Sequence, residues 1–247
     1  MSDILQNQLP YDSDAPRGLP GIAPLDMADW LIFDDAFAPQ MHERARLLAA
    51  DRGAVLAMDK TACLAAMELL DLVLDQAYGG VADRVTRRDG VGIAINRDDP
   101  LGTLAHLVQE DFCILQKIGD EHILTGAILC FPASWKLSEK FMRPLVAIHD
   151  GVDEYDANIA KRVQRMFDGV RPGRPLWRSN VLWYRNAELY QPRSIHDPRR
   201  QHDGAGGDFL RSERQCIVRL PQSGAVVFSI HTFVVARNTH EPADTPA

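Results

Sequence analysis

The chain has 247 residues, a size that one globular domain can reach, and its 46% hydrophobic and 25% charged residues are ordinary for such a domain. Its net charge of −7 argues against a general nucleic-acid-binding protein, which needs a basic surface to neutralise phosphates. No apolar run approaches the roughly 20 residues that span a bilayer, and the N-terminus lacks a signal pattern, so we expect a cytoplasmic protein without membrane or nucleic-acid partners.

The N-terminal stretch 1–25 is rich in proline and polar residues, which indicates an extended arm on the surface. Helical spacing of apolar residues follows over 39–51 and, more strongly, over 59–78, where Asp59 can cap the start and Gly79-Gly80 can end the helix. A short helix is expected over 100–106, because Pro100 suits a first helical turn.

The remainder is typical of antiparallel sheet, with turn signals at 119–121 and 221–224 that join two hairpins. A helix is expected over 153–167, a long polar loop over 191–208, and a polar tail over about 237–247. The expected strands cover residues 112–118, 122–131, 179–185, 213–220 and 225–235. The predicted class is therefore α+β, with an antiparallel sheet whose helices cover one face, in a single domain over 1–247.

The four cysteines are widely dispersed and form no C-x-x-C pair or ferredoxin-like spacing. Cys113, Cys130 and Cys216 lie in apolar, strand-like runs, and Cys63 lies in an apolar helix. We therefore expect four reduced core thiols and no iron–sulfur cluster in this chain.

Residues 130–155 contain the strongest chemical signal, because an apolar stripe over 145–148 leads directly to His149 and an acidic turn. A neutral imidazole at the end of an apolar run is a good ligand for a metal or a haem iron. A buried histidine that donates to a backbone carbonyl fits the same pattern, so both interpretations stay open at this point.

Several short motifs occur in an order that resembles the haem-dependent oxidative N-demethylase family, over about two hundred residues. Each motif is weak alone, and their shared order makes the resemblance specific. They are Trp30 before an acidic pair, Gln109-Glu110-Asp111 entering a strand, Phe131-Pro-Ala-Ser-Trp135, Ile148-His149, the run from Arg214-Gln215 through Leu220-Pro221 to Phe228, and Ile230 with Thr232-Phe233.

The resemblance implies a PAS-like domain that binds haem b and oxidises a small secondary amine with O2, releasing formaldehyde. It also implies that electrons come from a separate flavin- and ferredoxin-type reductase, since the chain has no dinucleotide fingerprint and no cluster cysteines. The alternative is a non-catalytic PAS-like protein that senses or binds haem or a small molecule.

The chain departs from the family pattern at two places. The family's His-x-Pro-Val-Pro turn is replaced by His149-Asp-Gly-Val-Asp153, which lacks both of the rigid prolines. Histidine occupies position 231, where the resemblance leads us to expect arginine, and this changes charge, reach and pH response. The sensing alternative draws on both departures.

Site roles follow from the resemblance and from strand alternation. His149 is the expected iron ligand, and its neighbours Asp150 and Asp153 could bind the far ring nitrogen or cap the next helix. Glu213 and Gln215 should face one way and Arg214 the other. Glu213 could then hold a protonated amine and Arg214 a haem propionate, unless both lie on an exposed strand edge.

Further candidates come from the other motifs. Glu110 could feed protons to bound oxygen, or it could lie in a helix-to-strand junction exposed to water. Trp135 and Lys136 could wall the haem site, or Trp135 could be an ordinary core residue. Tyr184 and His231 are expected substrate contacts, and strand alternation allows only one of Trp183 and Tyr184 to point inward.

A non-haem metal site made of histidines and aspartates in the 191–208 loop is a competing interpretation. Its candidate ligands are His196, Asp197, His202 and Asp208, whose spacing fits no standard ligand motif. A polar loop without a metal accounts for the same residues.

Overall fold

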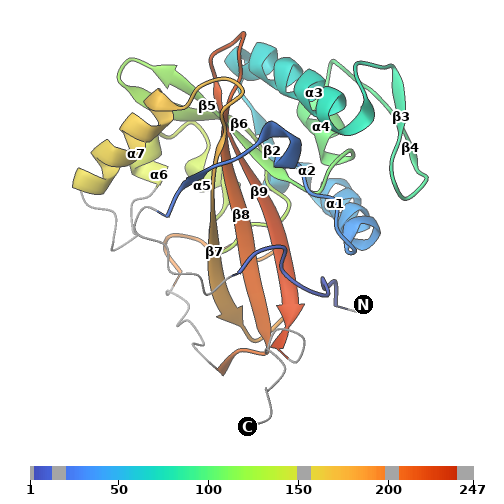
Figure 1. Ribbon diagram of the computed structural model, residues 1–247. Coiled ribbons are helices and arrows are strands. Elements are labelled where there is room, and N and C mark those ends of the chain that lie inside the picture. The colour runs from blue at the N-terminus through green and yellow to red at the C-terminus, as the bar shows by residue number, and fades with distance from the viewer. Residues whose placement is uncertain (1–2, 13–20, 149–156, 198–205, 238–247) are drawn as a thin grey trace.

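The computed structural model describes residues 3–12, 21–148, 157–197 and 206–237. A seven-stranded antiparallel sheet forms its centre, with helices packed against both faces (Figure 1). In spatial order the strands are β1 (Ala23–Pro24), β7 (Leu176–Tyr184), β8 (Phe209–Arg219), β9 (Val226–Ala236), β5 (Asp111–Ile118), β6 (Glu121–Ile128) and β2 (Leu56–Met58). The α+β class with an antiparallel sheet is thus confirmed, although helices cover two faces and not one.

Seven α-helices, two 3-10 turns and a small second sheet complete the described residues. The helices are α1 (Phe37–Ala50), α2 (Arg52–Val55), α3 (Cys63–Tyr78), α4 (Pro100–Ala105), α5 (Leu137–Lys140), α6 (Leu145–Ile148) and α7 (Ala157–Gly169). The 3-10 turns are η1 (Met27–Asp29) and η2 (Lys60–Ala62), and the small sheet pairs β3 (Arg84–Thr86) with β4 (Gly92–Ala94).

The helix α3 follows directly from its sequence signals. The Asp59 side chain accepts a hydrogen bond from Thr61 N at the start of η2, which continues into α3. Gly79 ends α3 with φ +79°, a left-handed conformation that costs glycine little because it has no Cβ. Leu69 and Leu70 are completely buried, whereas Leu64 is 76% exposed, so α3 packs one side against the sheet and turns the other to solvent.

Each face of the sheet packs against its own hydrophobic cluster. On the α3 face, Phe112, Ile114 and Val227 pack with helix residues that include Leu69 and Leu104. On the α7 face, Ile217 and Ile230 pack with residues of the short helices and α7, among them Leu137, Leu145 and Phe167. We use these two names for the faces below.

Most predicted strands have the expected pairing but different ends. β6 ends at Ile128, three residues before the predicted end, because the backbone N–H groups of Cys130 and Phe131 donate to the Asp111 carboxylate and not to a neighbouring strand. β8 begins at Phe209, four residues before the predicted start; it pairs with β9 along its whole length and with β7 from Phe209 to Ile217.

Cys113, Cys130 and Cys216 are buried and reduced, and Cys63 is reduced and half-buried. Burial raises the pKa of Cys130 to about 12 and that of Cys216 to about 11, so these thiols stay protonated at neutral pH. None of the helices in the described part of the chain combines the length and apolarity that spanning a bilayer demands.

Candidate functional site

Strand pairing sorts the polar residues of β7, β8 and β9 onto opposite faces. On the α7 face, Glu213 pairs with Asn180 on one side and Thr232 on the other, while Gln215 pairs with Arg178. We call these five residues the strand row. On the α3 face, Arg214 pairs with His231, so Glu213 and Arg214 face opposite ways as predicted.

Glu213 is a buried carboxylate held by amide donors. Its Oε2 accepts hydrogen bonds from Asn180 Nδ2 at 3.1 Å and Gln215 Nε2 at 3.0 Å, and its own N–H donates to Asn180 Oδ1. The side chain is 9% exposed. The alternative that Glu213 and Arg214 lie on an exposed strand edge is wrong, because β8 is an inner strand and both residues are buried.

Arg211 connects Glu213 to Tyr184 on the same face. Its Nη2 lies 3.7 Å from Glu213 Oε1, and its guanidinium carbon lies 5.9 Å from the centre of the Tyr184 ring. Arg211 also donates to the backbone carbonyls of Leu189 and Phe131, which ties two loops to the end of the sheet. Tyr184 is buried, and Trp183, on the other face, is only half-buried, as strand alternation predicts.

Three buried polar atoms of β7, β8 and β9 on the α7 face have no hydrogen-bond partner among the described residues. They are Arg178 Nε, Arg211 Nε and Thr232 Oγ1. Leaving a buried donor or acceptor unpaired costs about 1–3 kcal/mol, so such atoms are rare in folded proteins and call for an explanation. Two cationic donors and a hydroxyl on one face are groups that an anionic, partly apolar ligand would satisfy.

The α3 face carries a different arrangement around His231. Its Nδ1 lies 3.0 Å from Glu110 Oε1, and its Nε2 lies 3.0 Å from Asp34 Oδ2. Glu110 also accepts from the Ile32 backbone N–H, and Asp34 accepts from Gln6 and Gln109. We call Asp34, Glu110 and His231 the His231 network.

An imidazole with a carboxylate oxygen at each nitrogen must be protonated to donate to both. Burial alone would lower the pKa of His231, but the hydrogen bonds and charges of Asp34 and Glu110 outweigh burial and raise the pKa to about 9. Burial also opposes ionisation of Asp34, but its hydrogen bond to His231 leads a set of interactions that lower its pKa. At neutral pH His231 is thus an imidazolium held between the side chains of Asp34 and Glu110.

Glu110 lies between α4 and β5, in the predicted helix-to-strand junction. The alternative that this junction is exposed to water is wrong, because Glu110 is only 1% exposed. Next to it, Asp111 accepts from Arg44 Nη1 at 2.6 Å, and both side chains are fully buried. Arg44 also donates to the carbonyls of Ala105, Gln109 and Glu110, which fixes the entry to β5.

Arg214 is occupied on the α3 face. Its guanidinium donates to the carbonyls of Asp29 and Trp30, and it lies over the Trp177 ring at 5.6 Å. The neighbouring Trp30 Nε1 donates to Ser229 Oγ at 2.9 Å. In this structure Arg214 holds the 29–30 segment against the sheet, and a propionate contact for it stays a prediction.

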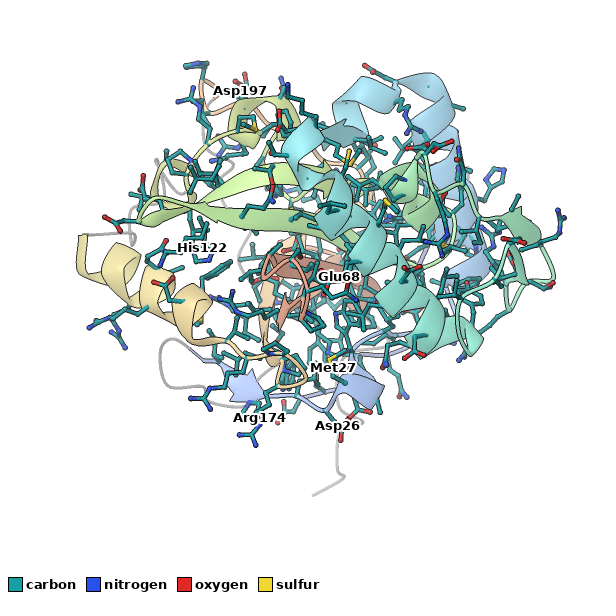
Figure 2. All side chains as sticks on the ribbon, turned by 90° about the horizontal axis from the view of Figure 1, so that it is seen from above. Asp26, Met27, Glu68, His122, Arg174 and Asp197 are labelled. Atoms are coloured by element: carbon teal, nitrogen blue, oxygen red, sulfur yellow. The ribbon has the colours of Figure 1, made fainter. Side chains whose placement is uncertain are left out.

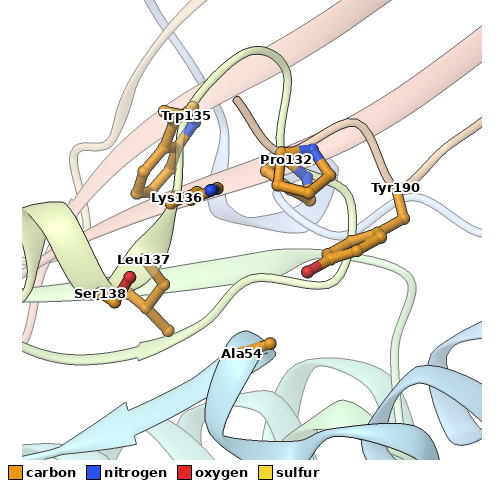
Figure 3. A pocket seen from close by; sticks show the side chains of 8 residues that line it. Ala54, Pro132, Trp135, Lys136, Leu137, Ser138 and Tyr190 are labelled. Atoms are coloured by element: carbon orange, nitrogen blue, oxygen red, sulfur yellow. The ribbon is translucent and has the colours of Figure 1, made fainter. Parts of the chain in front are cut away.

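Trp135 and Lys136 line a small pocket together with Tyr190 and the ends of α2 and α5 (Figure 3). Its volume is ≈ 150 Å³, below the roughly 300–1,000 Å³ of typical ligand pockets. Two backbone hydrogen bonds between residues 132–134 and Gln191 build one of its walls. Trp135 also packs into the hydrophobic cluster of the α7 face, which is the core role that the sequence left open.

The expected iron ligand, His149, lies outside the described residues, as do Asp150, Asp153 and His202. The helix α6 ends at Ile148, and its Leu145 and Ile148 pack in the cluster of the α7 face. Within the part of the chain that the structure describes, no three His, Cys, Asp or Glu side chains gather as a metal site would require.

The predicted site residues thus fall into two groups. The structure brings Glu213 and Tyr184 together on the α7 face, and it joins Glu110 to His231 on the α3 face. His231 is therefore separated by the sheet from the other two expected substrate contacts.

Sequence reasoning missed Arg211 and Thr232 as members of the site. Strand alternation from Glu213 would have found Arg211, two residues earlier on the same face. It also missed the part that Asp34 plays in the His231 network, although the acidic pair after Trp30 was the available signal.

Comparison with known proteins points to one family. No curated protein matches this chain. Residues 21–241 match the family described as haem-dependent oxidative N-demethylase, alpha subunit-like, a span that includes the whole sheet and every predicted site residue. Because the match covers far more than half of the 247 residues, the chain belongs to the haem-dependent oxidative N-demethylase alpha subunit-like family.

Proposed function

We propose that this chain is the haem-binding subunit of a monooxygenase that removes a methyl group from a small secondary amine. Membership of the family over residues 21–241 carries the proposal. With dimethylamine as the simplest substrate, amine and O2 with two electrons and two protons give methylamine, formaldehyde and water. One oxygen atom enters formaldehyde and the other enters water, so the reaction needs an external electron donor.

The described residues fit a haem in two respects. A haem presents an apolar ring and two carboxylates, and the α7 face offers an apolar cluster beside the unpartnered donors Arg178 Nε and Arg211 Nε. Those donors suit the carboxylates, because charge-assisted hydrogen bonds to a guanidinium are strong and directional. His149 would supply the iron ligand, and Lys136 and Trp135 would contact the rim. When bound, haem b supplies the oxygen-activating chemistry, which side chains cannot provide.

Glu213 is the residue that we assign to the substrate. A buried carboxylate that accepts from two amides keeps lone pairs for a further donor, and a secondary ammonium carries two N–H groups. Asn180 and Gln215 orient the carboxylate, and Arg211, at 3.7 Å, limits how strongly it binds a second cation. Tyr184, whose ring lies against Arg211, would be a further contact for the substrate at the Arg211 end of the strand row. Glu110, across the sheet, would act on protons only through His231.

The test is the absorption spectrum of the purified protein before and after addition of haemin, in the wild type, His149→Ala and His196→Ala. His196 is an exposed histidine in the same half of the chain, so its removal controls for the loss of an imidazole. We expect a Soret band in the wild type and in His196→Ala, and its loss or shift in His149→Ala.

A wild type that takes up no haemin would overturn the proposal. If haem binds with two protein ligands and the spectrum ignores dimethylamine, the non-catalytic alternative is favoured. Formaldehyde release with NADPH alone, without a second protein, would contradict the separate reductase.

A further inference from the structure

The stretch 161–178 is strongly basic within an acidic chain. It contains six Lys and Arg residues and one acidic residue, which gives a net charge of +5. The whole chain carries −7, so the residues outside this stretch carry −12. Such separation of charge is a feature that partners of opposite charge recognise. The stretch covers most of α7, the turn after it and the start of β7.

The structure places four of these arginines on the outside. Arg162, Arg165, Arg171 and Arg174 are exposed, and none of them has a side-chain hydrogen bond or ion pair with a residue that the structure describes. The acidic residue, Asp168, is already paired with Lys117 Nζ at 2.6 Å. The four guanidinium groups, which we call the α7 arginines, are therefore available to a partner.

The fold explains why these side chains point outward. Val163, Met166 and Phe167 recur at helical spacing and pack on the α7 face of the sheet, which turns Arg165 away from the sheet and leaves Arg162 exposed at the flank of the packed side. Arg219 of β8 donates to the carbonyls of Phe167 and Val170 and so fixes the end of α7. In Figure 2, α7 runs along the edge of the molecule and Arg174 lies at its periphery.

The position of α7 relates this surface to the candidate site. Arg219 and Ile217, which hold α7 and its cluster, lie on the same strand and the same face as Glu213. The chain also runs from α6 through His149 into α7. A protein seated on the outer side of α7 would therefore be separated from the face that carries the strand row by α7 and its cluster.

We propose that the α7 arginines form the docking surface for an acidic face of the electron-donating partner protein. The inference rests on the proposed function for the partner's role, since that reaction requires two electrons from outside the chain. We infer that the partner's docking face is acidic, because it would complement a stretch of net charge +5 in a chain whose total charge is −7. Between exposed charges, such an attraction fades over about 8 Å at physiological salt, so binding should be salt-dependent.

The experiment measures binding of an acidic [2Fe–2S] ferredoxin, used as the probe, by calorimetry at low and at physiological salt. The test variants are Arg162→Glu/Arg165→Glu and Arg171→Glu/Arg174→Glu. The matched control is Arg84→Glu/Arg88→Glu, which makes the same change in net charge on exposed arginines of the β3–β4 hairpin, at the other end of the molecule (Figure 1). Thermal unfolding checks that all variants fold.

We expect each α7 variant to bind at least ten-fold more weakly at low salt, and the control to stay within about two-fold of the wild type. Equal weakening in test and control variants would overturn the proposal, because it would reflect net charge alone. So would a wild type that ignores ferredoxin but binds anionic lipid vesicles or duplex DNA. Ferredoxin binding can be measured without catalytic turnover. If the protein took up no haem, the demethylase proposal would be wrong, but the calorimetric comparison of the variants would still test the docking surface.

Discussion

The His231 network and the strand row lie on opposite faces of the same strands, yet they satisfy their polar atoms differently. In the network, both ring nitrogens of His231 face carboxylates, and of the three side chains only Glu110 Oε2 lacks a partner in the described residues. In the strand row, Arg178 Nε and Thr232 Oγ1 are unpartnered, and the nearby Arg211 Nε is too. Polar groups that bond one another, as in the His231 network, stabilise the fold. Unpaired donors beside a buried carboxylate, as in the strand row, are suited to binding a ligand.

The largest effect should come from breaking the buried pair next to the network. Asp111→Asn removes the charge that faces Arg44 and cannot accept from Cys130 N, Phe131 N and Arg44 as the carboxylate does. We expect a loss of about 3–5 kcal/mol in the free energy of unfolding, measured by urea denaturation. Asp168→Asn breaks an exposed pair of the same 2.6 Å length and should cost about 0–1 kcal/mol. Equal losses would contradict the distinction between buried and exposed pairs.

The next effect is a loss of stability at alkaline pH. The pKa of His231 is raised from 6.5 to about 9 in the folded protein, so its contribution is complete below pH 6.5 and disappears as pH rises toward 9. A shift of this size corresponds to roughly 3 kcal/mol. His231→Arg keeps a cation between Asp34 and Glu110 and should lack this alkaline decline. The measurement is the midpoint of urea unfolding of the wild type and of His231→Arg at each pH from 6 to 10. If the midpoints of both proteins fell in parallel with pH, His231 would be excluded as the titrating group.

A smaller free-energy change, seen in binding, is expected in the strand row. Glu213→Gln keeps the shape but removes the charge that we assign to the amine, so dimethylamine should bind about ten-fold or more weakly to the haem-loaded protein. Its free energy of unfolding should change by about 1 kcal/mol or less. Spectral titration gives the affinity, and Glu121→Gln, an exposed acid in β6, is the control. Unchanged amine affinity would remove Glu213 from the substrate site.

The smallest effect is expected at two hydroxyls of β9, those of Ser229 and Thr232, which lie on opposite faces of the strand. Ser229→Ala leaves the buried Trp30 Nε1 without its acceptor and should cost about 1–2 kcal/mol. Thr232→Val replaces an unpartnered hydroxyl with a methyl group of the same shape and should be neutral, or stabilising by up to about 1 kcal/mol. Denaturation of the haem-free protein measures both, and a costly Thr232→Val would mean that this hydroxyl has a partner.

Sequence signals predicted the elements whose ends depend on local chemistry. Asp59, Gly79 and Pro100 sit where caps and first turns require them, and α3 and α4 follow. The short strands β1, β2 and the β3–β4 hairpin were missed, because two or three residues form a strand only when a distant partner supplies the hydrogen bonds. Leu56–Met58, for example, pairs with residues 126–128 of β6.

The candidate site was only partly predictable for the same reason. Strand alternation correctly placed Glu213, Gln215 and Arg214, since the period of two is a local property. It could not reveal that His231 would meet Glu110, 121 residues away, or that Asp34 would meet its other nitrogen. Those contacts depend on the order of strands in the sheet, which no single stretch of sequence encodes.

The N-terminal arm has a consequence for association between molecules. β5 pairs with β9 only as far as Ile230, so the rest of β9 offers its second edge, and Gln6 occupies it through the Gln6 N–Val234 O and Val234 N–Gln6 Oε1 hydrogen bonds. An uncovered strand edge is a template for pairing with another chain. The residues around Gln6 thus cover an edge that could otherwise pair with another chain, and we expect their removal to favour aggregation.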